Sequence, residues 1–148
     1  MKSKKSILLV DDDERVLKGL SGYLALKGYT TETAKTGREA LEKSRSHFFN
    51  LAVLDIRLPD MDGTELLTKM IETEPKMKKI MLTGYPNLES AIESVNKKAD
   101  MYLVKPVEPK KLLAIVQEKL REQDEESKMG RNKLVKYIET RDKEADEG

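Results

Sequence analysis

The chain has 148 residues, of which 38% are hydrophobic, and its 28 Lys and Arg side chains nearly balance 27 Asp and Glu side chains. This size allows one ordinary domain with a buried core but not a second full domain. The near-zero net charge gives no overall electrostatic reason to expect a nucleic-acid or membrane partner. The chain has no cysteine and no apolar run of about 18 residues, and its N-terminal apolar run is too short for a signal peptide, so we expect a cytoplasmic location.

Short apolar runs alternate with segments of helical periodicity along the chain. Three of the runs, "ILLV", "LAVL" and "KIMLT", are continuous rather than alternating, which is typical of parallel strands covered on both faces. The pattern predicts five strands, at residues 6–10, 30–34, 51–54, 79–83 and 101–104.

Apolar stripes and capping signals between these runs predict the helices. "TGRE" from Thr36 and "DGTE" from Asp62 resemble capping boxes, and Pro109 suits the first turn of a last helix. Five strand-helix units with right-handed crossovers predict an α/β fold with a doubly wound parallel sheet and helices on both faces. The stripes that define three of the helices are Val16, Leu17, Leu20 and Leu24, then Leu88, Ala91, Ile92 and Val95, then Leu112, Leu113, Val116 and Leu120.

Polar side chains directly follow four of the predicted strands. In doubly wound sheets the functional site lies outside the carboxyl ends of the strands, so these side chains should meet at one edge. Two carboxylates about 4 Å apart repel by roughly 4 kcal/mol at an effective dielectric near 20, so the group needs a cation, and carboxylate and carbonyl oxygens suit Mg²⁺. The residues concerned are Asp11, Asp12 and Asp13, then Asp55, then Thr83, then Lys105 with Pro106.

Four segments, "ILLVDDDE", "LAVLDIRLPDMDG", "KIMLTGY" and "MYLVKP", resemble in order and spacing the receiver domain of two-component response regulators, of the kind found in chemotaxis regulators. The resemblance implies a flavodoxin-like sheet of order 2-1-3-4-5. It implies a receiver domain at residues 1–121, followed by a charged tail at 122–148 that is helical or flexible. A receiver is a phosphoacceptor signalling domain rather than an enzyme acting on an external substrate.

The resemblance also assigns roles to the residues at the strand ends. Asp55 would accept a phosphoryl group from a sensor histidine kinase or a phosphotransfer protein. Lys105 and Thr83 would contact that group, and the Lys105-Pro106 peptide bond would be cis. Asp13 would lie outside the site and cap the first helix. The implied ligands of Mg²⁺ (or Mn²⁺) are Asp11, Asp12, Asp55 and the backbone carbonyl of Arg57, with Asp11 holding a metal-bound water or orienting Lys105.

Phosphorylation is expected to change the surface of the chain. Thr83 would move its hydroxyl onto the phosphoryl group and Tyr102 would then turn inward, altering the surface of the fourth helix, fifth strand and fifth helix for a downstream protein partner. Arg57 and Tyr85 flank the site where family members tune phosphate lifetime, and their bulk predicts slow hydrolysis. One departure from the family is Lys98-Ala99, where receivers usually have Gly-Ala.

Several alternatives stay open at this stage. Asp55 alone could be a helix cap and Tyr102 a half-buried packing residue. A haloacid-dehalogenase-type phosphatase would need an acid where Arg57 stands, and a nucleotide-binding module would need glycines where the chain has acids. The remaining alternatives are an adaptor or phosphate-sink receiver, or the receiver part of a longer regulator. The tail could be a solvated helix or a frayed end, a coiled-coil or dimer arm, or a linker into an output domain. A phosphorylation-dependent homodimer is a possible assembly, and direct nucleic-acid binding is not expected.

Overall fold

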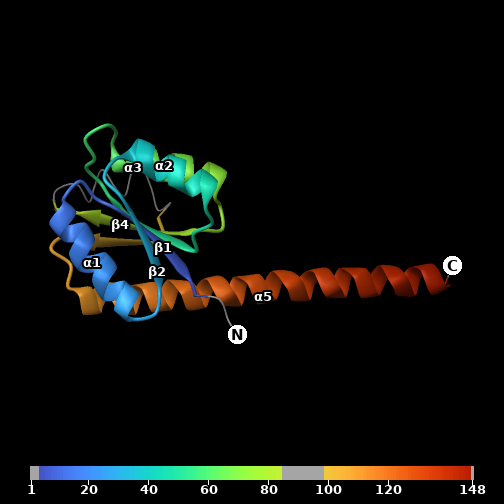
Figure 1. Cartoon of the computed structure of the whole chain (residues 1–148). Helices are drawn as coiled ribbons and strands as arrows, with labels where there is room; N and C mark the ends of the chain where they lie inside the picture. Colours follow the sequence, from blue (N-terminus) through green and yellow to red (C-terminus); the bar gives the residue numbers. More distant parts are fainter. Residues whose placement is uncertain (1–3, 85–98, 148) are drawn as a thin grey trace.

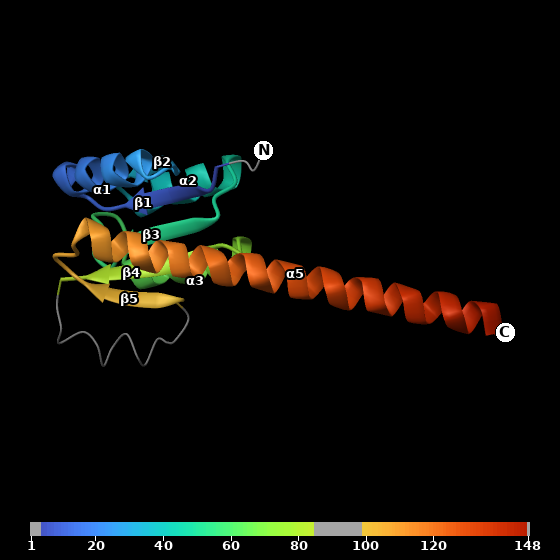
Figure 2. The ribbon, with the colours of Figure 1, turned by 90° about the horizontal axis from the view of Figure 1, so that it is seen from below.

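The computed structural model of the chain describes residues 4–84 and 99–147, with side chains as far as residue 141. All five strands form one parallel sheet of order β2-β1-β3-β4-β5, as predicted (Figures 1 and 2). The described part of the chain contains the strands β1 (Ser6–Val10), β2 (Thr30–Ala34), β3 (Leu51–Asp55), β4 (Lys78–Thr83) and β5 (Met101–Val104) and the helices α1 (Glu14–Leu26), α2 (Gly37–Ser46), α3 (Gly63–Thr73) and α5 (Pro109–Glu147).

Helices cover both faces of the sheet, and each face has its own apolar core. Leu8 and Val10 of β1 pack in the cluster with α2 and α3, whereas Ile7 and Leu9 pack in the cluster with α1 and α5. Figure 1 shows these two pairs of helices on opposite sides of the sheet. Every residue of β3 is buried, which explains why its sequence is continuously apolar up to Asp55.

Side-chain caps start the helices where the sequence predicts. Asp13, Thr36 and Asp62 are the N-caps of α1, α2 and α3, and each accepts a hydrogen bond from a backbone N–H of the first turn. The predicted capping boxes differ in detail. The carboxylate of Glu39 accepts from Lys35 N at 3.1 Å, one residue before the cap, and Glu65 instead pairs with Lys69 at 3.5 Å.

Two strands are one residue longer than predicted. β3 continues through Asp55, because Asp55 pairs in register with Leu82 and the next N–H, of Ile56, donates to Leu82 O at 2.9 Å. β4 begins at Lys78, whose buried ammonium forms ion pairs with Asp100 at 3.7 Å and Glu126 at 2.9 Å. The predicted helix carrying Leu88, Ala91, Ile92 and Val95 falls on residues 85–98, outside the described residues.

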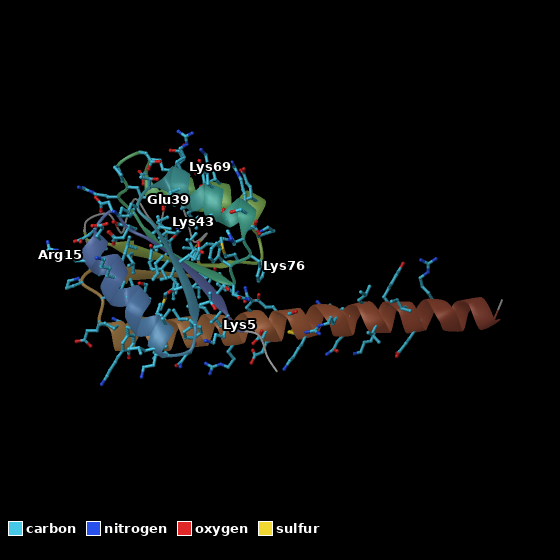
Figure 3. All side chains as sticks on the ribbon, viewed as in Figure 1. Lys5, Arg15, Glu39, Lys43, Lys69 and Lys76 are labelled. Atoms are coloured by element: carbon cyan, nitrogen blue, oxygen red, sulfur yellow. The ribbon has the colours of Figure 1, made fainter. Side chains whose placement is uncertain are left out.

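The helix α5 is much longer than the sheet that it covers. It passes residue 121 without a break and continues to Glu147, projecting from the end of the sheet opposite the arrowheads of the strands (Figure 2). Lys5 and Lys76, labelled in Figure 3, lie at that end of the sheet. No described helix is long and apolar enough to cross a membrane.

A polar network attaches α5 to this end of the sheet beyond Arg121. Gln123 Nε2 donates to the backbone carbonyls of Asn50 and Lys76, both at 2.9 Å. Lys5 pairs with Asp124 at 2.8 Å. With the Lys78 to Glu126 pair, these contacts attach three residues of α5 past the expected domain boundary, Gln123, Asp124 and Glu126, to the rest of the domain.

The Gly63→Ala substitution should destabilise the fold at the loop that follows β3. A Cβ on Gly63 would lie 2.2 Å from the backbone oxygen of Asp55 and 2.6 Å from Ile56 Cα, so the backbone must move. We expect the free energy of unfolding, measured by urea denaturation, to fall by about 1–3 kcal/mol. The control is Gly22→Ala on the exposed side of α1, where no atom lies within 4 Å, and it should add up to about 1 kcal/mol. Equal effects of the two substitutions would contradict this explanation.

Candidate functional site

Polar side chains from four strand ends meet at one edge of the sheet. Asp11 follows β1, Asp55 ends β3, Thr83 ends β4 and Lys105 follows β5. Parallel pairing aligns these ends, with Val10 opposite Leu54 and Thr83 opposite Val104. Figure 2 shows the arrowheads of β1, β3, β4 and β5 directed to this edge, away from the projecting part of α5.

The Lys105 ammonium bridges two buried carboxylates. Its Nζ lies 2.5 Å from Asp11 Oδ2 and 3.1 Å from Asp55 Oδ2. Asp11 is 3% exposed and Asp55 is 5% exposed, so neither carboxylate has enough water around it to disperse its charge. The Lys105-Pro106 peptide bond is cis, and Lys105 N donates to Thr83 O at 2.7 Å.

Burial and like charge perturb both partners of this cluster. Burial, followed by the charge of Asp11, raises the pKa of Asp55 above its ordinary value of 3.8, although Lys105 opposes the shift. Burial by itself would lower the pKa of Lys105, but the hydrogen bond to Asp11 and the charge of Asp55 raise it above 10.5. The ammonium is therefore charged at neutral pH. The positive charge of Lys105 offsets only part of the cost of ionising Asp55 in this buried site.

Three carboxylates at this edge lie close enough to share one cation. Oxygens of Asp11, Asp12 and Asp55 all lie within 4.8 Å of one another. Asp12 is exposed, so one side of the group opens to solvent. Carboxylate oxygens in this arrangement, with room for waters, fit a hard divalent ion such as Mg²⁺. Asp13 does not join them, because its side chain caps α1 by accepting from Arg15 N at 2.9 Å.

Hydrogen bonds fix the loop that follows Asp55. Arg57 N donates to Asp55 Oδ1 at 3.3 Å, and Gly63 N donates to Ile56 O at 2.7 Å. An isolated antiparallel bridge joins Arg57 to Asp62 across the loop. These contacts place the Arg57 peptide directly beside the Asp55 carboxylate.

Asp60 is a residue of this loop that the sequence did not single out. Its carboxylate accepts hydrogen bonds from Gly37 N and Arg38 N, both at 2.9 Å, and thus ties the loop to the first turn of α2. The Arg38 and Gly37 N–H groups hold the pKa of Asp60 below its usual range. The only local signal was an acid in a Pro- and Gly-marked loop, which does not reveal a contact with a different helix.

The predicted switch residues Thr83 and Tyr102 belong to the neighbouring strands β4 and β5. Thr83 is 2% exposed at the end of β4. Tyr102 is half-buried on β5 and packs against the core beneath α2 and α3, with its hydroxyl 3.4 Å from Ala99 N. Two other predicted residues, Tyr85 and Lys98, lie outside the described residues.

Comparison with known proteins gives one consistent family. The family model described as the response regulator receiver domain matches residues 7–117. The chain is 37% identical over 114 residues to the regulatory protein AtoC of Escherichia coli strain K12, covering 77% of this chain and 25% of AtoC. It is 35% identical over 115 residues to the response regulator MprA of Mycolicibacterium vanbaalenii, covering 78% of this chain and 50% of MprA. The chain thus spans a quarter to a half of these relatives.

Solved structures agree with this result. The CheY-like response regulator receiver domain protein from Methanospirillum hungatei JF-1 superposes with a TM-score of 0.79 at 51% identity, covering 84% of this chain and 99% of that one. The BeF3-activated DrrB receiver domain superposes with a TM-score of 0.72 at 35% identity, covering 80% of this chain and 99% of that one. Because the family match runs from within β1 to the first part of α5 and includes every residue gathered at the carboxyl edge, the chain belongs to the response regulator receiver domain family.

Proposed function

We propose that the chain accepts a phosphoryl group on Asp55 from a phosphohistidine of a sensor histidine kinase or phosphotransfer protein. The observation that carries the proposal is the Asp55 carboxylate at the end of β3, with the Lys105 ammonium 3.1 Å away and two further carboxylates within reach of a shared cation. An Asp55 oxygen attacks phosphorus, the bond from phosphorus to the histidine nitrogen breaks, and the imidazole leaves with its electron pair. The product is an aspartyl phosphate.

The residues around Asp55 supply positioning and charge. Asp11, Asp12 and Asp55, whose carboxylates lie close together, would hold Mg²⁺ or Mn²⁺ together with the backbone carbonyl of Arg57, and the ion would supply positive charge for the phosphoryl oxygens. Lys105 passes from the Asp55 carboxylate to a phosphoryl oxygen as transfer proceeds. Asp11 keeps Lys105 in place, since its carboxylate accepts from the same ammonium at 2.5 Å.

A recess beside the carboxylates suits the approach of the donor protein. It has a volume of about 530 Å³ and lies between the start of α1 and the segment after β5. Its wall includes Val16 and Leu20 on one side and Pro106 and Val107 on the other, next to Lys105. An apolar wall next to the acceptor can bind an apolar surface of the donor protein and so hold its phosphohistidine close to Asp55.

The output of the switch is a changed surface around β5. Thr83 moves its hydroxyl to the phosphoryl group and Tyr102 turns inward in response. Val104, on the edge strand β5, is 46% exposed, so this surface already offers an apolar contact to a downstream protein. The receiver is a signalling domain that acts in the cytoplasm and catalyses only its own phosphorylation and slow dephosphorylation.

Two forms of this function differ in what lies downstream. In one, the chain is the receiver part of a longer regulator, which its coverage of 25% of AtoC favours. In the other, it is an adaptor or phosphate sink that passes its signal by docking. A pull-down with and without beryllofluoride, a phosphoryl mimic, separates them by whether a separate partner protein is captured.

Asp55 should be the phosphoacceptor. Incubation with acetyl phosphate and Mg²⁺ should add one phosphoryl group to the wild type, as read by intact mass, and none to Asp55→Ala or to wild type in EDTA. Asp13→Asn should be modified normally, because Asn caps a helix as well as Asp does. Modification of Asp55→Ala, or none of a folded wild type, would refute the assignment.

Asp55 should also reduce stability in the absence of divalent cations. The pKa of Asp55 is raised in the folded chain above its ordinary value of 3.8. The free energy of unfolding therefore falls as the pH rises from 3.8 through the raised pKa. At pH 7 in EDTA we expect the free energy of unfolding of Asp55→Asn to exceed that of the wild type by on the order of 1 kcal/mol. The difference should disappear toward pH 4 in urea titrations, and Asp13→Asn should show no such trend. A less stable Asp55→Asn at pH 7 would contradict the electrostatic explanation.

The aspartyl phosphate on Asp55 should hydrolyse slowly. Arg57 lies directly after the site and Tyr85 is expected to flank it, and bulky side chains there exclude attacking water. An Arg57→Asn, Tyr85→Glu variant should lose its phosphoryl group at least several-fold faster than wild type in a mass-spectrometric time course. An Arg15→Asn variant on α1 is the control for loss of a nearby positive charge. No acceleration in the double variant would show that these side chains do not shield the phosphoryl group.

A further inference from the structure

The face of α5 that packs on the sheet continues as an exposed apolar face beyond it. Val116 and Leu120 of this face are buried in the core. Continuing at intervals of three or four residues, the same face carries Ser127, Leu134 and Ile138. Leu134 is 58% exposed and Ile138 is 49% exposed. The part of the face that projects beyond the sheet therefore has an apolar surface that residues 4–84 and 99–141 leave exposed.

A groove lies on this face of α5, at the end of the sheet opposite the acidic edge. Its volume is about 980 Å³, and α5 contributes Gln123, Ser127, Gly130 and Leu134 to its wall. The body of the domain contributes Phe48, which is 72% exposed, together with Ile71 and Pro75. Ser127 and Gly130 leave the middle of the α5 wall low, so another helix can approach the backbone closely there.

The charges on this part of α5 fall into two opposite blocks. Four of the five residues at 122–126 are acidic and none is basic, whereas 128–136 contains four basic residues and no acid. Side by side in parallel, two such helices would set acid against acid and base against base. Antiparallel, each acidic block would face the basic block of the other helix. The acidic residues are Glu122, Asp124, Glu125 and Glu126, and the basic residues are Lys128, Arg131, Lys133 and Lys136.

We propose that the groove binds the projecting α5 of a second copy of this chain, in a two-fold antiparallel arrangement that crosses near Gly130. Leu134 and Ile138 of each copy then enter the groove of the other and cover Phe48. Glu126 faces Lys133 of the second copy at the edge of the contact. Glu126 can accept this contact because its side chain is 64% exposed while paired with Lys78.

The proposed contact is separate from the phosphorylation site. It lies at the end of the sheet from which α5 projects, whereas Asp55 lies at the carboxyl edge (Figures 1 and 2). We therefore expect the dimer to form with or without beryllofluoride at Asp55. Failure of this inference would leave the proposed role of Asp55 untouched.

Sedimentation equilibrium of the full 148-residue chain tests the apolar part of the contact. We expect a dimer whose dissociation constant rises at least tenfold in Leu134→Ser with Ile138→Ser, and also rises in Phe48→Ser. Met129→Ser is the matched control, because Met129 is 60% exposed but lies on the opposite side of α5. A monomer at 100 micromolar, an assembly larger than a dimer, or equal weakening by Met129→Ser would overturn the proposal.

Charge-reversal variants test the orientation. Lys133→Glu and Glu126→Lys should each weaken the homodimer at least tenfold, while their mixture should form a heterodimer. Lys111→Glu makes the same change in charge as Lys133→Glu on an exposed part of α5 and should have no effect. In a parallel dimer each reversed side chain would face its own copy and repel no more than the native one, so unweakened variants would refute the antiparallel arrangement.

The absence of cysteine allows a direct check of the pairing. Glu126→Cys mixed with Lys133→Cys should yield a disulfide-linked heterodimer under mild oxidation. Predominant links between identical positions would indicate a parallel pair and overturn the proposal. Circular dichroism of each variant confirms that the fold is intact, which we expect because the substituted side chains are largely exposed.

Discussion

The fold of this receiver is organised around two buried carboxylates, Asp11 and Asp55, that share the ammonium of Lys105. Unscreened like charges about 4 Å apart repel by several kcal/mol in a site of this kind, and Lys105 offsets only part of the repulsion, because the pKa of Asp55 stays raised. The arrangement persists because the parallel sheet around it is held by two apolar cores. A site with uncompensated negative charge at a rigid edge is prepared to bind a cation and, through it, a phosphoryl group.

The two sides of Asp55 are held differently. On one side, the loop after β3 is held by the close approach of Gly63 to the Asp55 backbone and by the anchoring of Asp60 on α2. On the other side, the Lys105 N–H contacts Thr83 O, which connects the end of β4 with the segment after β5. The proposed acceptor therefore sits on a fixed support, while the groups expected to respond to phosphorylation belong to β4 and β5, toward the opposite edge of the sheet from β2.

The helix α5 links the two ends of the molecule. It begins near the carboxyl edge, covers one core, and is attached at the far end of the sheet by Gln123 and by the Lys78 to Glu126 ion pair. Beyond Glu126, Leu134 and Ile138 on its apolar face are exposed. A single helix thus runs from the end of the sheet with the proposed phosphorylation site to the end with the proposed dimer contact.

The sequence by itself determined the strands, the helix N-caps and the identity of the residues at the carboxyl edge. Asp11, Asp55, Thr83 and Lys105 each stand at a strand end, and parallel pairing makes all such ends neighbours. Only the tertiary structure decided that Lys105 contacts both carboxylates, that Asp60 reaches α2, and that Lys78 is buried with Glu126 as its partner. These contacts join side chains that are distant in sequence, and their geometry depends on how helices pack on the sheet, which no local pattern of residues encodes.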